Sequence, residues 1–206
     1  MKKIIPLVVA LFLAGSATSQ SSSNCISKGK NIVNLYYGVN VWAGVYKAAA
    51  ATDAIDLKVK SLGPVGLVYE HLVTDKIGIG AEFGYSSILM TYRDPGINLT
   101  TGLAEDFEAE WKFTTIRAMF RANFHFAESE NFDAYGLVSA GYRGTTFSFK
   151  TNDPSYDEAN VTFRGFIPFG IKPGLGFRYF FTGNIGINCE LAAGTPLIAG
   201  GLSLKF

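Results

Sequence analysis

The chain has 206 residues, and 18 lysines and arginines nearly balance 17 aspartates and glutamates, for a formal net charge of +1. This balance excludes the strongly basic character that marks nucleic-acid-binding domains. Hydrophobic residues make up 48% of the sequence, which is rich in aromatic residues and glycine, with 17 Phe, 10 Tyr and 23 Gly.

The first twenty residues, "MKKIIPLVVALFLAGSATSQ", have the layout of a secretory signal peptide. Lys2 and Lys3 precede an apolar run over 4–14, and small residues follow it. This run is shorter than the ~20 residues that a membrane-spanning helix needs. We therefore predict a signal peptide over 1–19, a short polar lead-in over 20–30, and export of the rest of the chain.

Cys25 and Cys189 are the only cysteines, and an exported pair could form a disulfide. However, Cys25 lies in the polar lead-in, whereas Cys189 lies within an apolar alternation. A bridge requires Cα atoms within ~7 Å of each other. We expect no bridge between them.

From Asn31 onward, apolar residues recur with a period of two, which is typical of β-strands. In "IGIGAEFGY" (77–85), apolar side chains alternate with glycines and one glutamate. In 166–181 the second face is mainly glycine, with Lys172 and Arg178. Eight strands are predicted in this way: 31–46, 57–73, 77–92, 111–126, 132–149, 162–181, 184–194 and 198–206.

Short and long connections alternate between these strands, as in a meander. The segments 74–76, 127–131 and 182–183 are short, whereas 48–56, 93–110 and 150–161 are longer and acidic. In lipid, an open sheet would leave two edges unpaired, so only a closed barrel is viable. We predict an all-β fold over 31–206, an eight-stranded antiparallel up-and-down transmembrane β-barrel with both termini beside the short turns.

A soluble ligand-binding barrel would show the same alternation, with its apolar face inside. Here the apolar face carries almost no charge in most strands, and aromatic residues mark its two ends, which favours contact with lipid. The expected girdles are Tyr179, Phe181, Phe124, Phe126 and Phe206 at the turn side, and Tyr85, Phe163 and Phe169 at the loop side.

Four features fit this prediction less well. Pro64, Pro168 and Pro173 fall within predicted strands, where proline removes a ladder donor. We expect bulges near the outer rim to absorb them. The strand over 132–149 does not alternate cleanly, so its faces are not assigned.

The segments "GLGFRYFFTGNIGINCELA" (174–192) and "GLSLKF" (201–206) resemble the small eight-stranded outer-membrane barrels of Gram-negative bacteria, the OmpA, OmpX and OmpW kind. The resemblance implies a monomer in the cell outer membrane, in contact with lipid and lipopolysaccharide. It also implies that the barrel-assembly machinery reads Leu202, Leu204 and Phe206. Members of this family include adhesins, membrane anchors and small-solute channels, so the resemblance leaves the function open.

The predicted inner face carries most of the charges that fall within strands. We expect a network of these charges to fill the lumen, because an unpaired buried charge is costly. Lys205 is expected to meet Glu190 or Glu70. The alternative is a polar path through a narrow porin-like channel. The predicted network consists of Glu70, Glu82, Arg117, Arg121, Lys172, Arg178, Glu190 and Lys205.

The long connections hold most of the acidic residues and are expected to lie outside the cell. They could contact an extracellular partner or bind calcium, or they could simply be solvated. The alternation of acid and aromatic residues in "DFEAEW" (106–111) indicates that the fourth strand extends beyond the membrane, where its edge could pair with a partner.

The residues give no sign of an enzyme, a cofactor or a metal site. His71 and His125, the two histidines, lie near short turns with no catalytic constellation around them. No spacing of His and Cys fits zinc. We therefore expect a structural or surface-interaction role.

Overall fold

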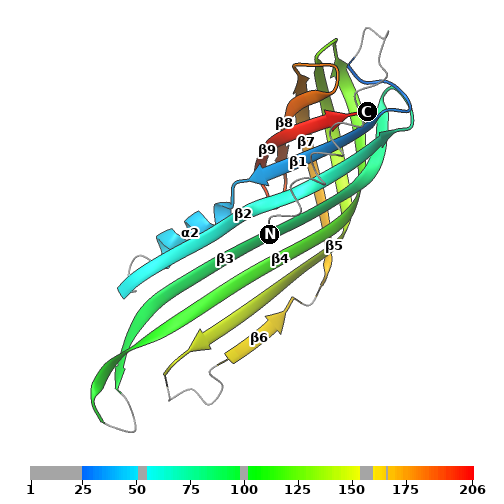
Figure 1. The fold of residues 1–206 in the computed structure, drawn as a ribbon. Coiled ribbons are helices and arrows are strands. Elements are labelled where there is room, and N and C mark those ends of the chain that lie inside the picture. Colours follow the sequence, from blue (N-terminus) through cyan, green and yellow to red (C-terminus); the bar gives the residue numbers. More distant parts are fainter. Residues whose placement is uncertain (1–24, 51–54, 98–101, 154–159, 166) are drawn as a thin grey trace, which may run out of the picture.

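A computed structural model describes residues 25–50, 55–97, 102–153, 160–165 and 167–206. The predicted signal peptide over 1–19 lies outside the described residues, as do the first residues of the lead-in. The elements are β1 (Asn31–Gly38), α2 (Val41–Ala50), β2 (Ile55–Leu72), β3 (Ile77–Ile97), β4 (Ala104–Glu128), β5 (Phe132–Thr151), β6 (Asn160–Arg164), β7 (Phe169–Phe180), β8 (Ile185–Ala192) and β9 (Ile198–Lys205) (Figure 1).

The strands form one antiparallel sheet that closes on itself. Its order is β4-β3-β2-β1-β9-β8-β7-β5-β6, and β4 also pairs with β5. Since β6 pairs only with β5, the other eight strands make a ring in which chain neighbours are also sheet neighbours. The predicted eight-stranded antiparallel up-and-down barrel is confirmed.

The first predicted strand, over 31–46, is wrong in its second half. Strand β1 ends at Gly38, and helix α2 begins at Val41. Asn40 is a favourable residue for the N-terminal cap, and its carbonyl accepts a hydrogen bond from the Ala43 amide at 3.1 Å. The alanine-rich end of "VWAGVYKAAA" favours a helix more strongly than the apolar alternation favours a strand.

The predicted strand over 162–181 is divided into β6 and β7, which both pair with β5. Pro168 lies in the interruption between them, where its carbonyl accepts a hydrogen bond from the Arg143 amide at 3.1 Å. Pro64 lies at a register shift between Leu62 and Val65 in β2, so the expected bulge is confirmed there.

The two faces of the ring differ sharply in polarity. Outward side chains on β4 are apolar from Ile116 to Phe126, and Phe120 is 83% exposed. Inward side chains of the same strand, Arg117, Arg121 and His125 among them, are buried. An apolar outside around a polar inside is the distribution of a transmembrane barrel, because lipid rather than water surrounds it.

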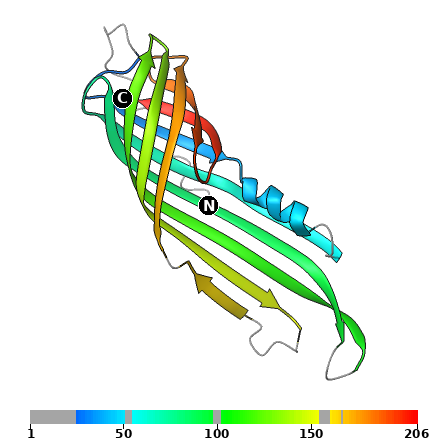
Figure 2. The ribbon, with the colours of Figure 1, turned by 180° about the vertical axis from the view of Figure 1, so that it is seen from behind.

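Strands β2 to β5 continue well beyond the ring at the end opposite the short turns (Figures 1 and 2). In this extension the polarity of the two faces is reversed. Beyond Ile116, the outward side of β4 carries Thr114, Lys112 and Glu110, which line one polar depression together with side chains of β5. The inward side carries aromatic residues instead.

The reversal occurs at one level across three neighbouring strands. Ser86 pairs with Thr115, and Thr115 pairs with Thr145. One step toward the ring, Tyr85 pairs with Ile116 and faces outward. Because this level separates an apolar from a polar outer surface, it marks the outer limit of the lipid-facing band. We call the row of Ser86, Thr115 and Thr145 the hydroxyl row.

Aromatic rings pack against one another on the inward face of the extension. The centroid of Trp111 lies 5.0 Å from that of Phe147 and 4.4 Å from that of Phe149. Phe163 in β6 pairs with Phe147, so it lies beyond the hydroxyl row rather than in the outer girdle where we expected it. Among the described residues, no helix is long and apolar enough to span a bilayer.

Candidate functional site

The lumen contains two clusters of buried ionisable side chains, and the first lies near the short turns. We call Glu70, His125, Asp133 and Arg178 the base cluster. Arg178 donates from Nη2 to Glu70 at 2.5 Å and from Nη1 to Asp133 at 3.0 Å. The His125 ring nitrogens contact the same two carboxylates, with Nδ1 at 2.7 Å from Asp133 and Nε2 at 2.9 Å from Glu70.

Four different strands supply the base cluster, so it ties opposite walls of the ring together. Glu70 comes from β2, His125 from β4, Asp133 from β5 and Arg178 from β7. The Arg178 guanidinium also lies over the ring of Tyr135, 4.2 Å from its centroid. Arg178 has no exposed surface, so its charge depends entirely on these protein contacts.

A second group, which we call the central cluster, lies farther from the turns and consists of Glu82, Arg121, Lys172 and Glu190. Arg121 donates to Glu190 at 2.6 and 3.1 Å and to Glu82 at 3.4 Å. Lys172 Nζ lies 2.7 Å from Glu82 Oε1. These short contacts bring together side chains of β3, β4, β7 and β8.

Hydroxyl groups complete the coordination of the central carboxylates. Tyr36 donates to Glu82 at 3.1 Å, and Ser139 donates to the other Glu82 oxygen at 3.2 Å. Tyr135 donates to Glu190 at 2.9 Å. Each carboxylate of this cluster thus accepts from a cation and from at least one hydroxyl, which offsets its removal from water.

A segment of the lead-in covers the end of the lumen beside the short turns. Cys25 and Ile26 are buried in one apolar cluster with Ile32, Leu72 and Phe180. The Cys25 amide donates to Ser129 O at 2.8 Å, and the Gly29 amide donates to Leu72 O at 2.8 Å. The lead-in over 25–30 is therefore a packed plug at this end, although its sequence reads as a polar linker.

Two of the predicted network residues, Lys205 and Arg117, form no ion pair with an acidic residue that the structure describes. Lys205 donates to the backbone carbonyl of Cys25, and its Nζ lies 4.6 Å from the Phe180 centroid, so the expected contact with Glu190 or Glu70 is wrong. Arg117 is buried, and within the described part of the chain its Nη2 donates to Tyr36 Oη at 3.4 Å.

Sequence reasoning missed two acid–base partners, His125 and Asp133. Asp133 is the second residue of β5, whose outward face carries small residues such as Ala134 and Gly136. This face lacks the bulky apolar side chains that reveal alternation elsewhere. The register of β5 against β4 shows which face of β5 points inward, since Asp133 lies beside the inward side chain of His125.

The residues of the expected assembly signal lie along the outer side of β9 and just after it. Leu202 and Phe206 are exposed, whereas Ser203 between them is buried in the lumen. The Phe206 amide and carbonyl both bond to Asn31, at 3.0 and 2.8 Å, which completes the ladder between β9 and β1.

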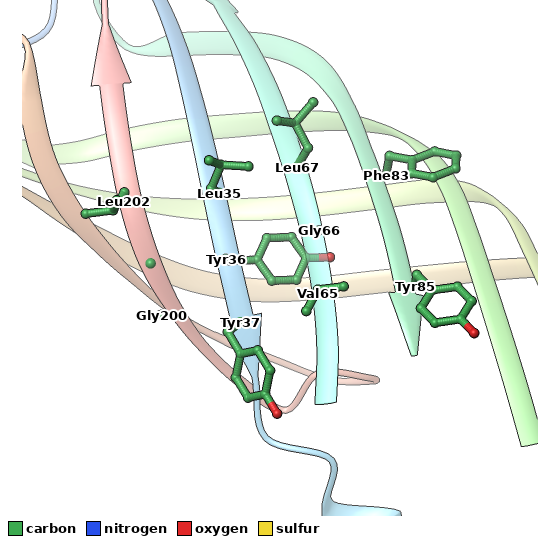
Figure 3. A pocket seen from close by; sticks show the side chains of 11 residues that line it. Leu35, Tyr36, Tyr37, Val65, Gly66, Leu67, Phe83, Tyr85, Gly200 and Leu202 are labelled. Atoms are coloured by element: carbon green, nitrogen blue, oxygen red, sulfur yellow. The ribbon is translucent and has the colours of Figure 1, made fainter. Parts of the chain in front are cut away.

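The outer surface has a shallow apolar groove of about 520 Å³ where β9, β1, β2 and β3 lie side by side (Figure 3). Leu35, Leu67 and Phe83 surround it, and the hydroxyls of Tyr37 and Tyr85 point toward its outer end. Tyrosines at this height suit the boundary between lipid tails and headgroups.

The chemistry available inside the lumen is electrostatic. Four carboxylates, Glu70, Glu82, Asp133 and Glu190, face Arg121, Lys172, Arg178 and the histidine His125. Among the residues that the structure describes, no group of three or more His, Cys, Asp or Glu side chains could hold a metal ion. Cys25 and Cys189 are both free.

No known family matches this chain, and no curated protein matches its sequence. Several solved structures resemble it. The N-terminal β-barrel domain of Pseudomonas aeruginosa OprF is 10% identical with a TM-score of 0.45, and the match covers 87% of this chain and 99% of that one.

Ail, the attachment invasion locus protein of Yersinia pestis, is 14% identical with a TM-score of 0.43, over 87% of this chain and 99% of that one. The outer membrane protein OprG of P. aeruginosa is 13% identical with a TM-score of 0.41, over 88% and 97%. Likeness at this level carries no argument about function, and the barrel fold rests on the strand pairing described above.

Proposed function

We propose that this chain is an outer-membrane barrel of a Gram-negative envelope with a closed lumen, and that it acts through its extracellular extension rather than by transport. The observation that carries this proposal is the double closure of the lumen. The base cluster and the central cluster each connect four strands through buried ion pairs, and the plug over 25–30 lies beneath them.

An ion crossing this lumen would have to separate Arg178 from two carboxylates and Arg121 from two more. Breaking one buried pair costs about 3–5 kcal/mol, so open states would be rare. An eight-stranded barrel also has an interior only wide enough for its own side chains.

The extension provides the surface that such a protein would present outside the cell. Its outward face is polar, with Glu110 opposite Lys150 and Lys112 opposite Ser148 on neighbouring strands. Its tips carry the acidic connections, which would contact lipopolysaccharide or an extracellular partner. Insertion would depend on the barrel-assembly machinery, which would read Leu202, Leu204 and Phe206.

Planar-bilayer recording tests the closed lumen. Purified full-length protein should produce no reproducible single-channel steps, while a general porin in the same bilayers gives them as a positive control. A heat-unfolded sample controls for contaminating conductance. Reproducible steps of one size from the folded protein would overturn the closed lumen and support the narrow-channel alternative.

A further inference from the structure

The register of the extension arranges its outward side chains in rows that cross β2 to β6, parallel to the hydroxyl row. The first outward row beyond the apolar band consists of Leu62, Ser87, Thr114, Thr146 and Arg164. The second row consists of Lys60, Leu89, Lys112, Ser148 and Thr162. These ten described residues include three cations and no carboxylate, so the outer surface next to the band carries positive charge alone.

Carboxylates appear in these rows farther from the band, and they face cations there. Glu110 in the third row lies opposite Lys150. Glu108 in the fourth row lies opposite Arg93, which also forms an ion pair with Asp56 at 3.3 Å. The outer rows therefore mix both signs of charge, as an ordinary solvated surface does, whereas the two rows nearest the band do not.

The three cations of the inner rows have no acidic partner within the described part of the chain. Lys60, Lys112 and Arg164 are exposed, and none of them forms an ion pair with a described residue. They lie on β2, β4 and β6, so neighbouring cations are two strands, or about 10 Å, apart. We call these three residues the basic belt.

A polar depression of about 340 Å³ lies beside the middle cation of the belt. Its lining consists of Glu110, Lys112, Thr114, Thr146, Ser148 and Lys150. Arg164 is not part of this lining, but it is the ladder partner of Thr146 on the neighbouring strand. The side of the depression nearest the band therefore presents hydroxyls between Lys112 and Arg164, while Glu110 and Lys150 form its far side.

The outer surface between the depression and the ring is amphipathic. Ile116 and Gly144 are ladder partners one outward position closer to the ring than Thr146. Tyr142 is 51% exposed, and its hydroxyl lies over Gly144, where an added Cβ atom would overlap it. The tyrosine ring thus lies on the apolar band with its hydroxyl toward the depression. Tyrosines take this position between lipid tails and headgroups, so the depression lies at the level of the headgroups.

We propose that the basic belt and this depression bind the phosphate groups of an outer-leaflet glycolipid, with one phosphate between Lys112 and Arg164. Cations and hydroxyls together donate to several oxygens of one phosphate. Exposed cations hold a free ion weakly, because water and salt screen them. A lipid adds the contact of its acyl chains with the apolar band. The proposal rests on the outer-membrane location proposed above and names a partner for the outward face of the extension.

Titration calorimetry of the full chain in a non-ionic detergent tests this proposal, with bisphosphorylated lipid A as the ligand at constant ionic strength. We expect saturable binding that weakens as salt is added. Lipid A from which both phosphates have been removed should bind at least tenfold more weakly, and inorganic phosphate should show no saturable binding. Equal binding of the two lipids, or binding of inorganic phosphate as tight as that of lipid A, would overturn the proposal.

Lys112→Gln and Arg164→Gln should each weaken lipid A binding about fivefold, which is the attraction that one cation near an anionic lipid surface supplies. Arg93→Gln is the matched control, because Arg93 is an exposed arginine of the same sheet that lies in the fourth row and is paired with Asp56. It should bind lipid A as the unaltered chain does. Equal affinity of the unaltered chain and the double variant of Lys112 and Arg164 would exclude the belt as the binding site.

Two further measurements separate loss of binding from other failures. Since Lys112 and Arg164 are exposed, the double variant should unfold at the same urea concentration as the unaltered chain in vesicles that lack lipid A. Membrane fractionation should recover both proteins in the outer membrane. Recovery there with equal affinity for lipid A would overturn the basic belt alone, whereas recovery of the unaltered chain elsewhere would overturn the proposed location and the belt with it.

Discussion

At the scale of single residues, the lumen is organised around side chains that each serve two partners. Arg178 and His125 both connect Glu70 to Asp133, so four ionisable groups share four contacts. Removing one of these four side chains should destabilise the fold, since the charges of its partners would stay buried without compensation. Arg117 is the opposite case, because its removal leaves no carboxylate without a partner.

Arg178→Met should therefore lower the free energy of unfolding by about 3–5 kcal/mol, because it leaves two buried carboxylates with only His125 between them. Urea unfolding of the protein in lipid vesicles measures this change. Lys150→Met, on the exposed face of the extension, is a control expected to change stability by less than about 0.5 kcal/mol. A loss below about 1 kcal/mol for Arg178→Met would show that the base cluster does not support the fold.

Most inward residues could be predicted because glycine and charge alternate with bulky apolar side chains in β3, β7 and β8. What alternation cannot predict is which charges meet. Lys205 lies at an inward position of its strand, as the alternation predicts, but the plug places the Cys25 carbonyl where Lys205 donates a hydrogen bond to it. The alternation does not assign Asp133 to the inward face, because the outward residues of β5 are too small to show which face of the strand is apolar.

At the scale of the strands, the reversal of polarity along β4 shows where lipid contact ends. Thr114 and Phe120 share the outward face of this strand, on opposite sides of the boundary at the hydroxyl row. The sequence "DFEAEW" predicted a strand that extends beyond the membrane, and β4 does begin at Ala104. The level of the boundary emerges only when neighbouring strands are aligned by their register.

A lysine at these two outward positions should have very different effects. Phe120→Lys places a charge near the middle of the apolar band and should reduce stability in vesicles by about 2–4 kcal/mol. Thr114→Lys lies at the boundary, and its effect should be about 1 kcal/mol or less. Similar losses for both variants would mean that the apolar band does not face lipid.

The helix α2 shows the limit of periodicity as a guide to an element. The segment 39–46 continues the apolar alternation of β1, but Asn40 can cap a helix and the residues that follow include several alanines. Helix formation depends on such a cap and on the sum of propensities over several residues. A short apolar alternation therefore does not exclude a helix.

At the scale of the whole molecule, the ring divides the chain into an end with short turns and an end with the long extension (Figure 2). The apolar band lies between them, so the two ends should meet different compartments. The native cysteines are poorly suited to report which end of the barrel faces which compartment. Burial, with the Asp133 charge nearby, raises the pKa of the Cys25 thiol to about 11, and Cys189 lies on the lipid-facing side of β8.

An engineered cysteine at each end should therefore report orientation against a low background. Lys150→Cys in the extension should react with a membrane-impermeant maleimide on intact cells. Gly183→Cys, in an exposed turn where an added Cβ meets nothing within 4 Å, should react only after the outer membrane is permeabilised. The reverse pattern would invert the proposed orientation, and labelling of both in intact cells would argue against a membrane barrier between them.

The pairing of β1 with β9 has a consequence for how the barrel forms. Ser203 donates to Asn34 at 2.8 Å, although the two residues are 169 positions apart in the chain. Contacts of such long range form slowly, because the intervening chain must be ordered before they stabilise it. Until this last seam closes, water still reaches the lumen charges, and the edges of β1 and β9 remain open to pairing with another chain. Pairing of β1 with β9 therefore competes with pairing between the open edges of two different chains. Because the second process depends on chain concentration, the yield of folded barrel should fall as that concentration rises.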